Sequence, residues 1–313
     1  MSAVRTEALH KHYGEVRALD GLDLAVAPGS IYGFLGPNGA GKTTAIRILT
    51  GLAKPTSGRA WIMGVEVGRG KSETTRSIGY LPQDPSFYPW MTGQGFIDYV
   101  GRVFGLSAME RHARTKELLA TVGLTEAAKR KVDGYSGGMR QRLGLAQALV
   151  NRPKVLLLDE PVSSLDPAGR KEMLDLIEAL QGQCTVLMST HILDDVERVC
   201  DTVGIISGGR MVTQEKRENL LSRYAEPAFE VEVVSGADKQ LHRWTRALDA
   251  KPWITSTAVH GQRTRIVVSD VQTAQRELLA SAVQAGLVIA RYEMVRPSLE
   301  DVFLRLVRAE HGG

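Results

Sequence analysis

The alternation of apolar and polar side chains changes its period along the chain, and these changes predict the secondary structure. In residues 3–32, Leu22, Leu24 and Val26 alternate with polar or small residues, which predicts antiparallel strands. Uninterrupted apolar runs predict strands buried on both faces, whereas apolar residues three or four positions apart predict helices. The expected strands that follow are 31–35, 60–63, 78–81, 155–160, 184–190, 203–206 and 210–212, and the expected helices are 44–49, 92–132, 140–150 and 168–181.

The pattern restarts after a polar segment at residues 222–228. Strands are then expected at 229–234, 254–260, 265–269 and 287–294, and helices at 238–248, 272–285 and 298–308. Without the last helix, this order is β-α-β-β-α-β, which is typical of ferredoxin-like domains. The sequence therefore predicts a large domain over residues 1–222, with a helical subdomain at about 84–150, and a small α+β domain over residues 228–313.

A glycine-rich stretch joins the expected strand 31–35 to the expected helix 44–49. Backbone N–H groups at the start of a helix, together with the helix dipole, attract a phosphate, and glycines let the backbone wrap around a phosphate chain. Lys42 can reach the outer phosphates, and the Thr43 hydroxyl can bind Mg²⁺. The stretch fits the phosphate-binding loop pattern, a glycine, four residues and then Gly-Lys-Ser/Thr. It consists of Gly36, Pro37, Asn38, Gly39, Ala40, Gly41, Lys42, Thr43 and Thr44.

Composition argues against several other classes of protein and is compatible with a phosphate-binding loop. The 313 residues have a formal net charge of +4, but Lys and Arg are scattered, so nucleic acid is not an expected partner. Cys184 and Cys200 are the only cysteines and form no CxxC pair, which argues against a disulfide framework or a zinc site. No apolar run approaches the roughly 20 residues that span a bilayer, and the first residues lack the apolar core of a signal peptide. We therefore expect a cytoplasmic protein.

Two carboxylates follow the apolar run 155–158, at a strand end of the kind where α/β sheets bind ligands. Adjacent acids at the end of a core strand cost desolvation free energy unless they bind a metal or handle a proton. Asp159 suits a magnesium site, and Glu160 suits polarising a water molecule. The structural alternative is a solvated strand end without a function.

Several other features are ambiguous from spacing alone. The turn Ser136-Gly137-Gly138 precedes a helix and offers a second anion site, but Ser-Gly-Gly is also a common linker. Tyr13 is able to stack on a purine or to occupy a strand edge, and Gln83 has the position of an ordinary loop residue. His191 stands just past a core strand, and this position fits both a structural and a catalytic role.

Together these motifs resemble those of the ATP-binding cassette ATPases over residues 4–220. Residues 36–43 resemble the Walker A loop and residues 155–159 the Walker B strand, with Glu160 at the place of the catalytic glutamate. Tyr135 stands where the signature motif usually has leucine, and Ser164 where the D-loop usually has alanine. The other matches are Tyr13 for the adenine-stacking aromatic, Gln83 for the Q-loop glutamine at the magnesium site, Ser136, Gly137 and Gly138 for the signature, Leu165 and Asp166 for the D-loop, and His191 for the switch histidine.

The resemblance implies an α/β fold of the P-loop NTPase cassette type, with a mixed sheet, an antiparallel β subdomain and a helical subdomain. It also implies binding of ATP and Mg²⁺ and hydrolysis of ATP by Glu160 and His191, where two cassettes meet head to tail and the signature of one covers the nucleotide of the other. Because the chain has one copy of each motif, a homodimer would provide two such sites.

Residues 297–303 resemble the tail of bacterial exporter ATPases of the drug-resistance type. This similarity implies a separate membrane permease and a location on the inner face of the cell membrane. The alternative is a cassette ATPase of DNA repair or translation that moves no solute, but such proteins usually have coiled-coil insertions or two cassettes. A nucleotide kinase would explain the phosphate loop but not the signature or the paired acids.

Overall fold

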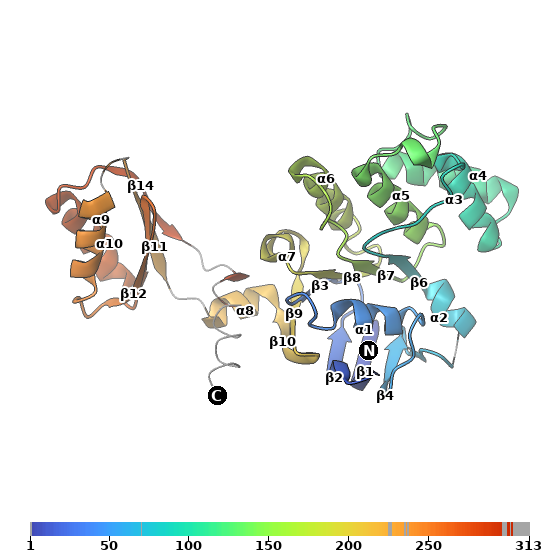
Figure 1. Cartoon of the computed structure of the whole chain (residues 1–313), viewed down its shortest axis with the longest axis horizontal. Helices are drawn as coiled ribbons and strands as arrows, with labels where there is room; N and C mark the ends of the chain where they lie inside the picture. Colours follow the sequence, from blue (N-terminus) through green and yellow to red (C-terminus); the bar gives the residue numbers. More distant parts are fainter. Residues whose placement is uncertain are drawn as a thin grey trace. The chain divides into compact units, whose positions relative to one another are not determined.

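The computed structural model describes residues 2–69, 71–224, 227–234, 236, 238–295, 299–300 and 302 of the chain. The chain divides into two compact units, Met1–Arg217 and Glu218–Gly313 (Figure 1). Most of the helix expected at 298–308 lies outside the described residues. Among the described residues, no helix has the length and apolar character that crossing a bilayer requires.

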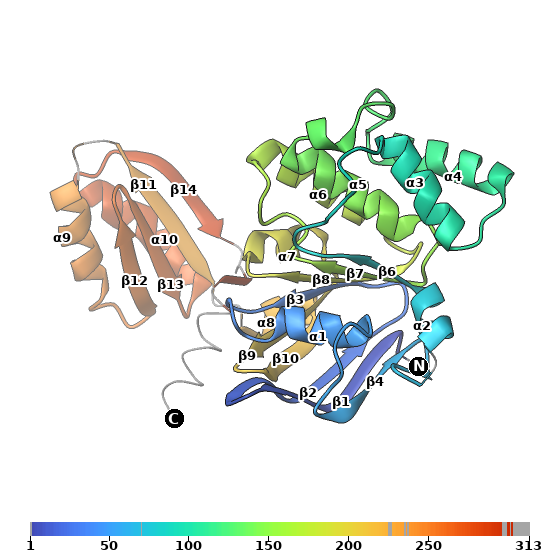
Figure 2. The ribbon, with the colours of Figure 1, turned by 45° about the vertical axis from the view of Figure 1, so that its right-hand side comes forward.

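The first unit contains two sheets with helices on both sides of the larger one (Figures 1 and 2). Its strands are β1 Val4–Tyr13, β2 Val16–Val26, β3 Ile31–Leu35, β4 Ser57–Ile62, β5 Val65–Glu66, β6 Ile78–Leu81, β7 Val155–Asp159, β8 Thr185–Thr190, β9 Thr202–Ser207 and β10 Arg210–Lys216. Its helices are α1 Lys42–Leu49, α2 Lys71–Ser77, α3 Gly93–Val103, α4 Ala108–Thr121, η1 Val132–Gly134, α5 Gly137–Leu149, α6 Pro167–Glu178 and α7 Leu193–Val199, and α8 Arg217–Tyr224 begins at its last residue.

The central sheet has the strand order β10-β9-β3-β8-β7-β6. All its neighbouring pairs are parallel except β9 and β10, which are antiparallel. The parallel register pairs Leu35 with Thr190 and Asp159 with Ser189. The carboxyl ends of β3, β7 and β8 therefore meet at one edge of the sheet, which is where ligands bind in open α/β sheets.

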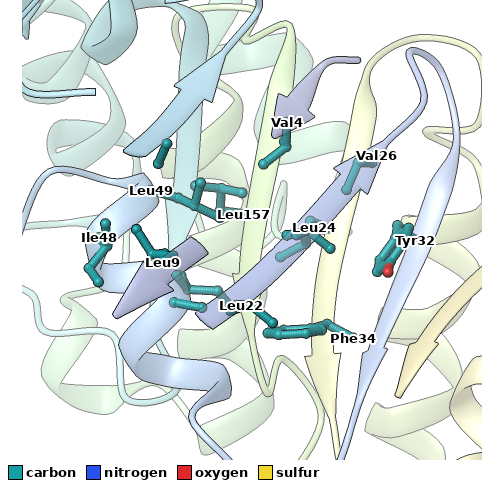
Figure 3. Packing of buried hydrophobic residues seen from close by; sticks show 14 of the residues in the cluster. Val4, Leu9, Leu22, Leu24, Val26, Tyr32, Phe34, Ile48, Leu49 and Leu157 are labelled. Carbon is teal, nitrogen blue, oxygen red and sulfur yellow. The ribbon is translucent and has the colours of Figure 1, made fainter. Parts of the chain in front are cut away.

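The second sheet of this unit is antiparallel, with the order β2-β1-β4-β5. Its apolar face packs with α1 against the central sheet, because Leu22 and Leu24 of β2, Ile48 of α1 and Leu157 of β7 belong to one buried cluster (Figure 3). This packing fixes α1, and with it the loop that precedes α1, against both sheets.

The helices α3, α4, α5 and α6 lie on the opposite side of the central sheet from α1 (Figure 2). Thr92 caps α3, with its hydroxyl accepting a bond from the N–H of Gly95 at 3.0 Å. The helical region expected at 92–132 consists of α3 and α4, separated by a break at 104–107, and turns follow the end of α4. The short helices α2, α7 and α8 were not expected, because segments of seven or eight mostly polar residues give little periodicity.

The second unit has the expected β-α-β-β-α-β order. Its elements are β11 Ala228–Val233, α9 Asp238–Leu248, β12 Ile254–His260, β13 Arg263–Val268, α10 Val271–Gln284 and β14 Ile289–Val295. All its strand pairs are antiparallel, and the sheet order is β12-β13-β11-β14. Both helices pack on one face of this sheet, where Trp244 of α9, Leu278 of α10 and Phe229 of β11 share a core. The structure thus confirms the expected α/β architecture of the first unit and the ferredoxin-like α+β order of the second.

Candidate nucleotide site

The loop between β3 and α1 has a conformation that requires glycine at two positions. Gly41, the N-cap of α1, has φ 106° and ψ 1°, and a Cβ on it would lie 2.4 Å from the carbonyl oxygen of Ala18. A Cβ on Gly36 would lie 2.4 Å from the carbonyl oxygen of Ile206. No described side chain caps α1, so the N–H groups of its first turn remain available to a phosphate.

Lys42 places a buried ammonium group under this loop. Its Nζ donates to the carbonyl oxygens of Gly36 at 2.6 Å and Pro37 at 3.1 Å, and it lies 3.4 Å from Oε1 of Glu160. Burial lowers the pKa of Lys42, and attraction to Glu160 counteracts this shift. The ammonium is thus poised to neutralise anionic charge that enters the loop.

Asp159 ends β7 as a buried carboxylate that accepts two hydroxyl bonds on the same oxygen. Thr43 Oγ1 donates to its Oδ1 at 3.0 Å, and Ser189 Oγ donates to it at 2.7 Å. Burial raises the pKa of Asp159, while these two hydrogen bonds lower it. A carboxylate and a hydroxyl side by side supply the oxygen ligands that Mg²⁺ prefers, so the residues present fit a magnesium ion.

Glu160 adopts a left-handed backbone conformation, with φ 48°. Such a conformation is uncommon outside glycine and tends to occur at functional sites. The N–H of Glu160 donates to Ser189, at 3.1 Å to the carbonyl oxygen and 3.0 Å to Oγ. Its carboxylate lies between two other predicted site residues, 3.4 Å from Nζ of Lys42 and 3.1 Å from Nδ1 of His191. The turn at this residue therefore brings the glutamate, the lysine and the histidine together.

These groups surround a cavity of about 610 Å³ within the first unit. Tyr13 lies at its exposed rim, with 48% of its surface accessible, and Lys11 Nζ lies 4.8 Å from the centre of its ring. Asp159 is buried and does not line the cavity but bonds to Thr43, which does. The predicted site residues that line it are Tyr13, Asn38, Gly39, Gly41, Lys42, Thr43, Thr44, Gln83, Glu160 and His191.

The predicted signature residues do not line this cavity. Ser136 caps α5 by accepting a bond from the N–H of Met139 at 3.2 Å, and it is exposed together with Gly137. A Cβ on Gly137 would meet no atom within 4 Å. Asp166 likewise caps α6 from an exposed position, accepting from the N–H of Gly169 at 2.8 Å. Both helix starts thus present exposed surface away from the cavity lining.

Tyr135, which replaces the usual leucine of the signature motif, is buried. Its hydroxyl donates to the carbonyl oxygen of Ala127 at 2.7 Å, and burial raises its pKa. A Cβ on Gly93 would lie 2.2 Å from this hydroxyl oxygen. The larger side chain is therefore accommodated by a hydrogen bond and by a glycine, and the neighbouring Ser136 keeps its capping position.

The sequence did not single out two residues that organise the site. Ser189 bonds to both acids, and Gln141 of α5, which is 2% exposed, donates from Nε2 to the carbonyl oxygen of Gln83 at 3.0 Å. Each is a polar side chain among buried positions, and that contrast with its neighbours was the available signal.

Comparison with known proteins agrees with this geometry. Residues 19–163 match the family model described as ABC transporter, and residues 216–307 match the one described as ATP-binding protein DrrA1-3-like, C-terminal domain. The chain is 41% identical over 303 residues to the uncharacterized ABC transporter ATP-binding protein YxlF of Bacillus subtilis, covering 97% of this chain and 99% of that protein. It is 39% identical to the daunorubicin resistance ATP-binding protein DrrA2 of Streptomyces coeruleorubidus, covering 97% and 94% of the two chains.

Among solved structures, the chain resembles the ATP-binding cassette MJ0796 in a dimeric post-hydrolysis state bound to ADP and Pi. The TM-score is 0.62 and the identity 28%, over 68% of this chain and 98% of that one. The cassette prediction is therefore confirmed over the DNA-repair and translation alternatives. The chain belongs to the ABC transporter family as a nucleotide-binding, ATP-hydrolysing subunit, with a C-terminal region of the DrrA1-3-like type.

Proposed function

We propose that this chain hydrolyses MgATP in the cavity at the carboxyl ends of β3, β7 and β8. A second copy of the chain completes each site. One observation supports this most strongly. The phosphate loop, Lys42, Glu160 and His191 surround a single cavity, whereas Ser136 and Gly137 are exposed outside its lining. Ser136 and Gly137 form a second possible phosphate site at a helix start, and this site does not line the cavity of its own chain. Such a site is suited to contact the nucleotide of a partner chain.

Within one chain, the residues divide the work of phosphoryl transfer, which depends on positioning and charge neutralisation. The loop from Gly36 to Thr44 and Lys42 hold the phosphates, and Tyr13 stacks on the adenine at the rim. Thr43, Asp159 and Gln83 hold Mg²⁺, which when bound offsets charge on the outer phosphates. Glu160 accepts a proton from the attacking water, and His191, 3.1 Å from Glu160, holds the outer phosphate and orients that carboxylate.

Between two chains, Ser136, Gly137 and Gly138 of one subunit close over the nucleotide of the other, with Asp166 near the shared boundary. ATP then joins the subunits and hydrolysis releases them, and a separate integral-membrane permease converts this cycle into export. In this proposal residues 1–222 form the cassette domain, with the helical subdomain at about 84–150, and residues 228–313 form an accessory domain for assembly or regulation. The protein works in the cytoplasm, on the inner face of the cell membrane.

A complementation experiment tests the two-chain site. Lys42→Ala should abolish hydrolysis because the outer phosphates lose their counter-charge. Ser136→Arg should also abolish it, by obstructing the partner's site, while ATP binding to a single subunit remains. In a mixture, a head-to-tail heterodimer has one site with both defects and one with neither, so steady-state phosphate release should partly recover.

Two outcomes would contradict the proposal. Hydrolysis at the wild-type rate by Lys42→Ala would exclude this cavity as the catalytic site. Loss of ATP affinity in Ser136→Arg as severe as in Lys42→Ala would place Ser136 in its own subunit's site. Arg140→Ala, a change at an exposed position on α5, serves as the matched control and should keep wild-type activity.

A further inference from the structure

A serine lies in the core directly beneath the two acids of the site. Ser189 belongs to β8, which is buried at every position, and it follows the apolar residues Val186, Leu187 and Met188. Its own exposed fraction is 0%. Burying a hydroxyl in such a strand costs free energy unless the hydroxyl forms hydrogen bonds, so its bonds indicate what it does there.

The chemistry of its two partners fixes the direction of both bonds. The backbone N–H of Glu160 can only donate, so Ser189 Oγ accepts at 3.0 Å. The single hydroxyl proton is then available to Asp159, whose Oδ1 accepts at 2.7 Å. Thr43 donates to the same Oδ1 at 3.0 Å. Two hydroxyl groups therefore converge on one oxygen of the Asp159 carboxylate and anchor it.

The second bond acts on the backbone of Glu160. This residue has φ 48°, and its N–H donates both to the carbonyl oxygen and to Oγ of Ser189. A left-handed conformation at a non-glycine residue persists only where surrounding contacts hold it. That conformation carries the Glu160 carboxylate to Lys42 and His191.

We propose that Ser189 is a positioning residue for both acids: its hydroxyl orients Asp159 for the metal and secures the backbone turn that places the Glu160 carboxylate. The inference rests on the proposed function, because it assigns Asp159 to the metal and Glu160 to the attacking water. It distinguishes Ser189 from a hydroxyl that is merely accommodated in the core. Partners that orient a metal ligand typically contribute on the order of 10- to 100-fold to metal affinity.

The test uses the full chain and three substitutions. Ser189→Ala removes both bonds of the hydroxyl, and Ser189→Thr retains the hydroxyl. Thr185→Val is the matched control, because Thr185 lies on the same strand, is 3% exposed, and accepts a bond from the N–H of Gly29 rather than from a site residue. Binding of Mn²⁺ is measured by electron paramagnetic resonance with the non-hydrolysable analogue AMP-PNP, and analogue binding is measured separately in EDTA.

Ser189→Ala should bind AMP-PNP in EDTA as the wild type does but bind Mn²⁺ on the order of 10- to 100-fold more weakly. At saturating Mg²⁺ its kcat should stay reduced while the KM for ATP is unchanged, because the Glu160 amide has lost an acceptor. Ser189→Thr should restore both quantities, and Thr185→Val should match the wild type in both.

Wild-type Mn²⁺ affinity in Ser189→Ala, or an equal loss in Thr185→Val, would overturn the positioning role. If Ser189→Ala does not fold, Ser189→Cys replaces it, since the thiol is a weak donor of similar size and should show the same direction of loss. If the wild type itself shows no metal-dependent binding of AMP-PNP, the proposed function fails. If the wild type binds AMP-PNP with the metal and the Ser189 variants have the same Mn²⁺ affinity as the wild type, the proposed function stands and this inference fails.

Discussion

The pair Gly93 and Tyr135 gives a prediction that can be worked from distances. An alanine at position 93 would place its Cβ 2.2 Å from the Tyr135 hydroxyl oxygen and 3.1 Å from Cζ, so the ring has to shift. Tyr135 is 5% exposed and donates to Ala127, which leaves the ring little freedom. Overpacking costs about 1–3 kcal/mol and a lost hydrogen bond about 1 kcal/mol. A helical Gly-to-Ala change returns up to about 1 kcal/mol.

Gly93→Ala should therefore lower the free energy of unfolding by about 1–3 kcal/mol, or Tm by roughly 2–4 °C per kcal/mol for a unit of this size. In the Tyr135→Leu background, which has the usual residue of the family, the same change should be neutral or stabilising because the hydroxyl is gone. Urea unfolding of the wild type, both single variants and the double variant gives the interaction free energy, expected to be about 2 kcal/mol.

Additive effects of the two substitutions, within about 0.5 kcal/mol, would refute the steric argument. Gly134→Ala is a suitable control because, apart from its two chain neighbours, the atom nearest to a Cβ there is the end of the Arg130 side chain, at 3.7 Å. It should show the same response in the wild-type and Tyr135→Leu backgrounds, which separates the clash from a general effect of alanine near the signature.

Two further predictions concern the C-terminal domain and the buried thiol of Cys184. A chain that ends at Glu226 should keep the MgATP affinity of the full protein, because every residue that lines the cavity belongs to the first unit; loss of affinity in a folded truncation would contradict this. Burial raises the pKa of Cys184 from 9.0 to about 11. This shift corresponds to at most about 2.7 kcal/mol in the free energy of unfolding. That contribution is present below pH 9 and is lost as the pH rises through 11. Cys184→Ala should reduce the alkaline loss of stability by up to that amount in urea titrations at pH 8 and pH 11, and an unchanged pH dependence would show that the thiol is not responsible.

The parts of the fold that the sequence predicted are those with a long or uninterrupted pattern. The all-apolar run before Asp159 and the amphipathic helices α9 and α10 were placed to within a residue or two, because their burial is visible in their composition. The short helix α7 was missed because seven residues contain too few turns to establish a period, and its position depends on packing against α6 and β3.

The candidate site shows the same division. Local motifs predicted the loop at Lys42 and the acid pair, because the residues of each motif are neighbours in the sequence and therefore also in space. The role of Ser189 depends on the register of β8 with β7, which pairs it with Asp159 from 30 residues away. Likewise, the bond from Gln141 to Gln83 joins residues 58 positions apart. Contacts of this kind follow from tertiary packing, and a single sequence gives no direct signal of them.

The central claim, that two chains complete each other's sites around ATP, is tested most directly by the oligomeric state of Glu160→Gln. The amide cannot accept the proton of the attacking water, so this variant should retain bound ATP and accumulate the closed state. Size-exclusion chromatography with light scattering should show a dimer with MgATP and a monomer without it, and the added substitution Ser136→Arg should abolish the dimer. A Glu160→Gln protein that stays monomeric with MgATP and hydrolyses it at the wild-type rate would contradict the claim.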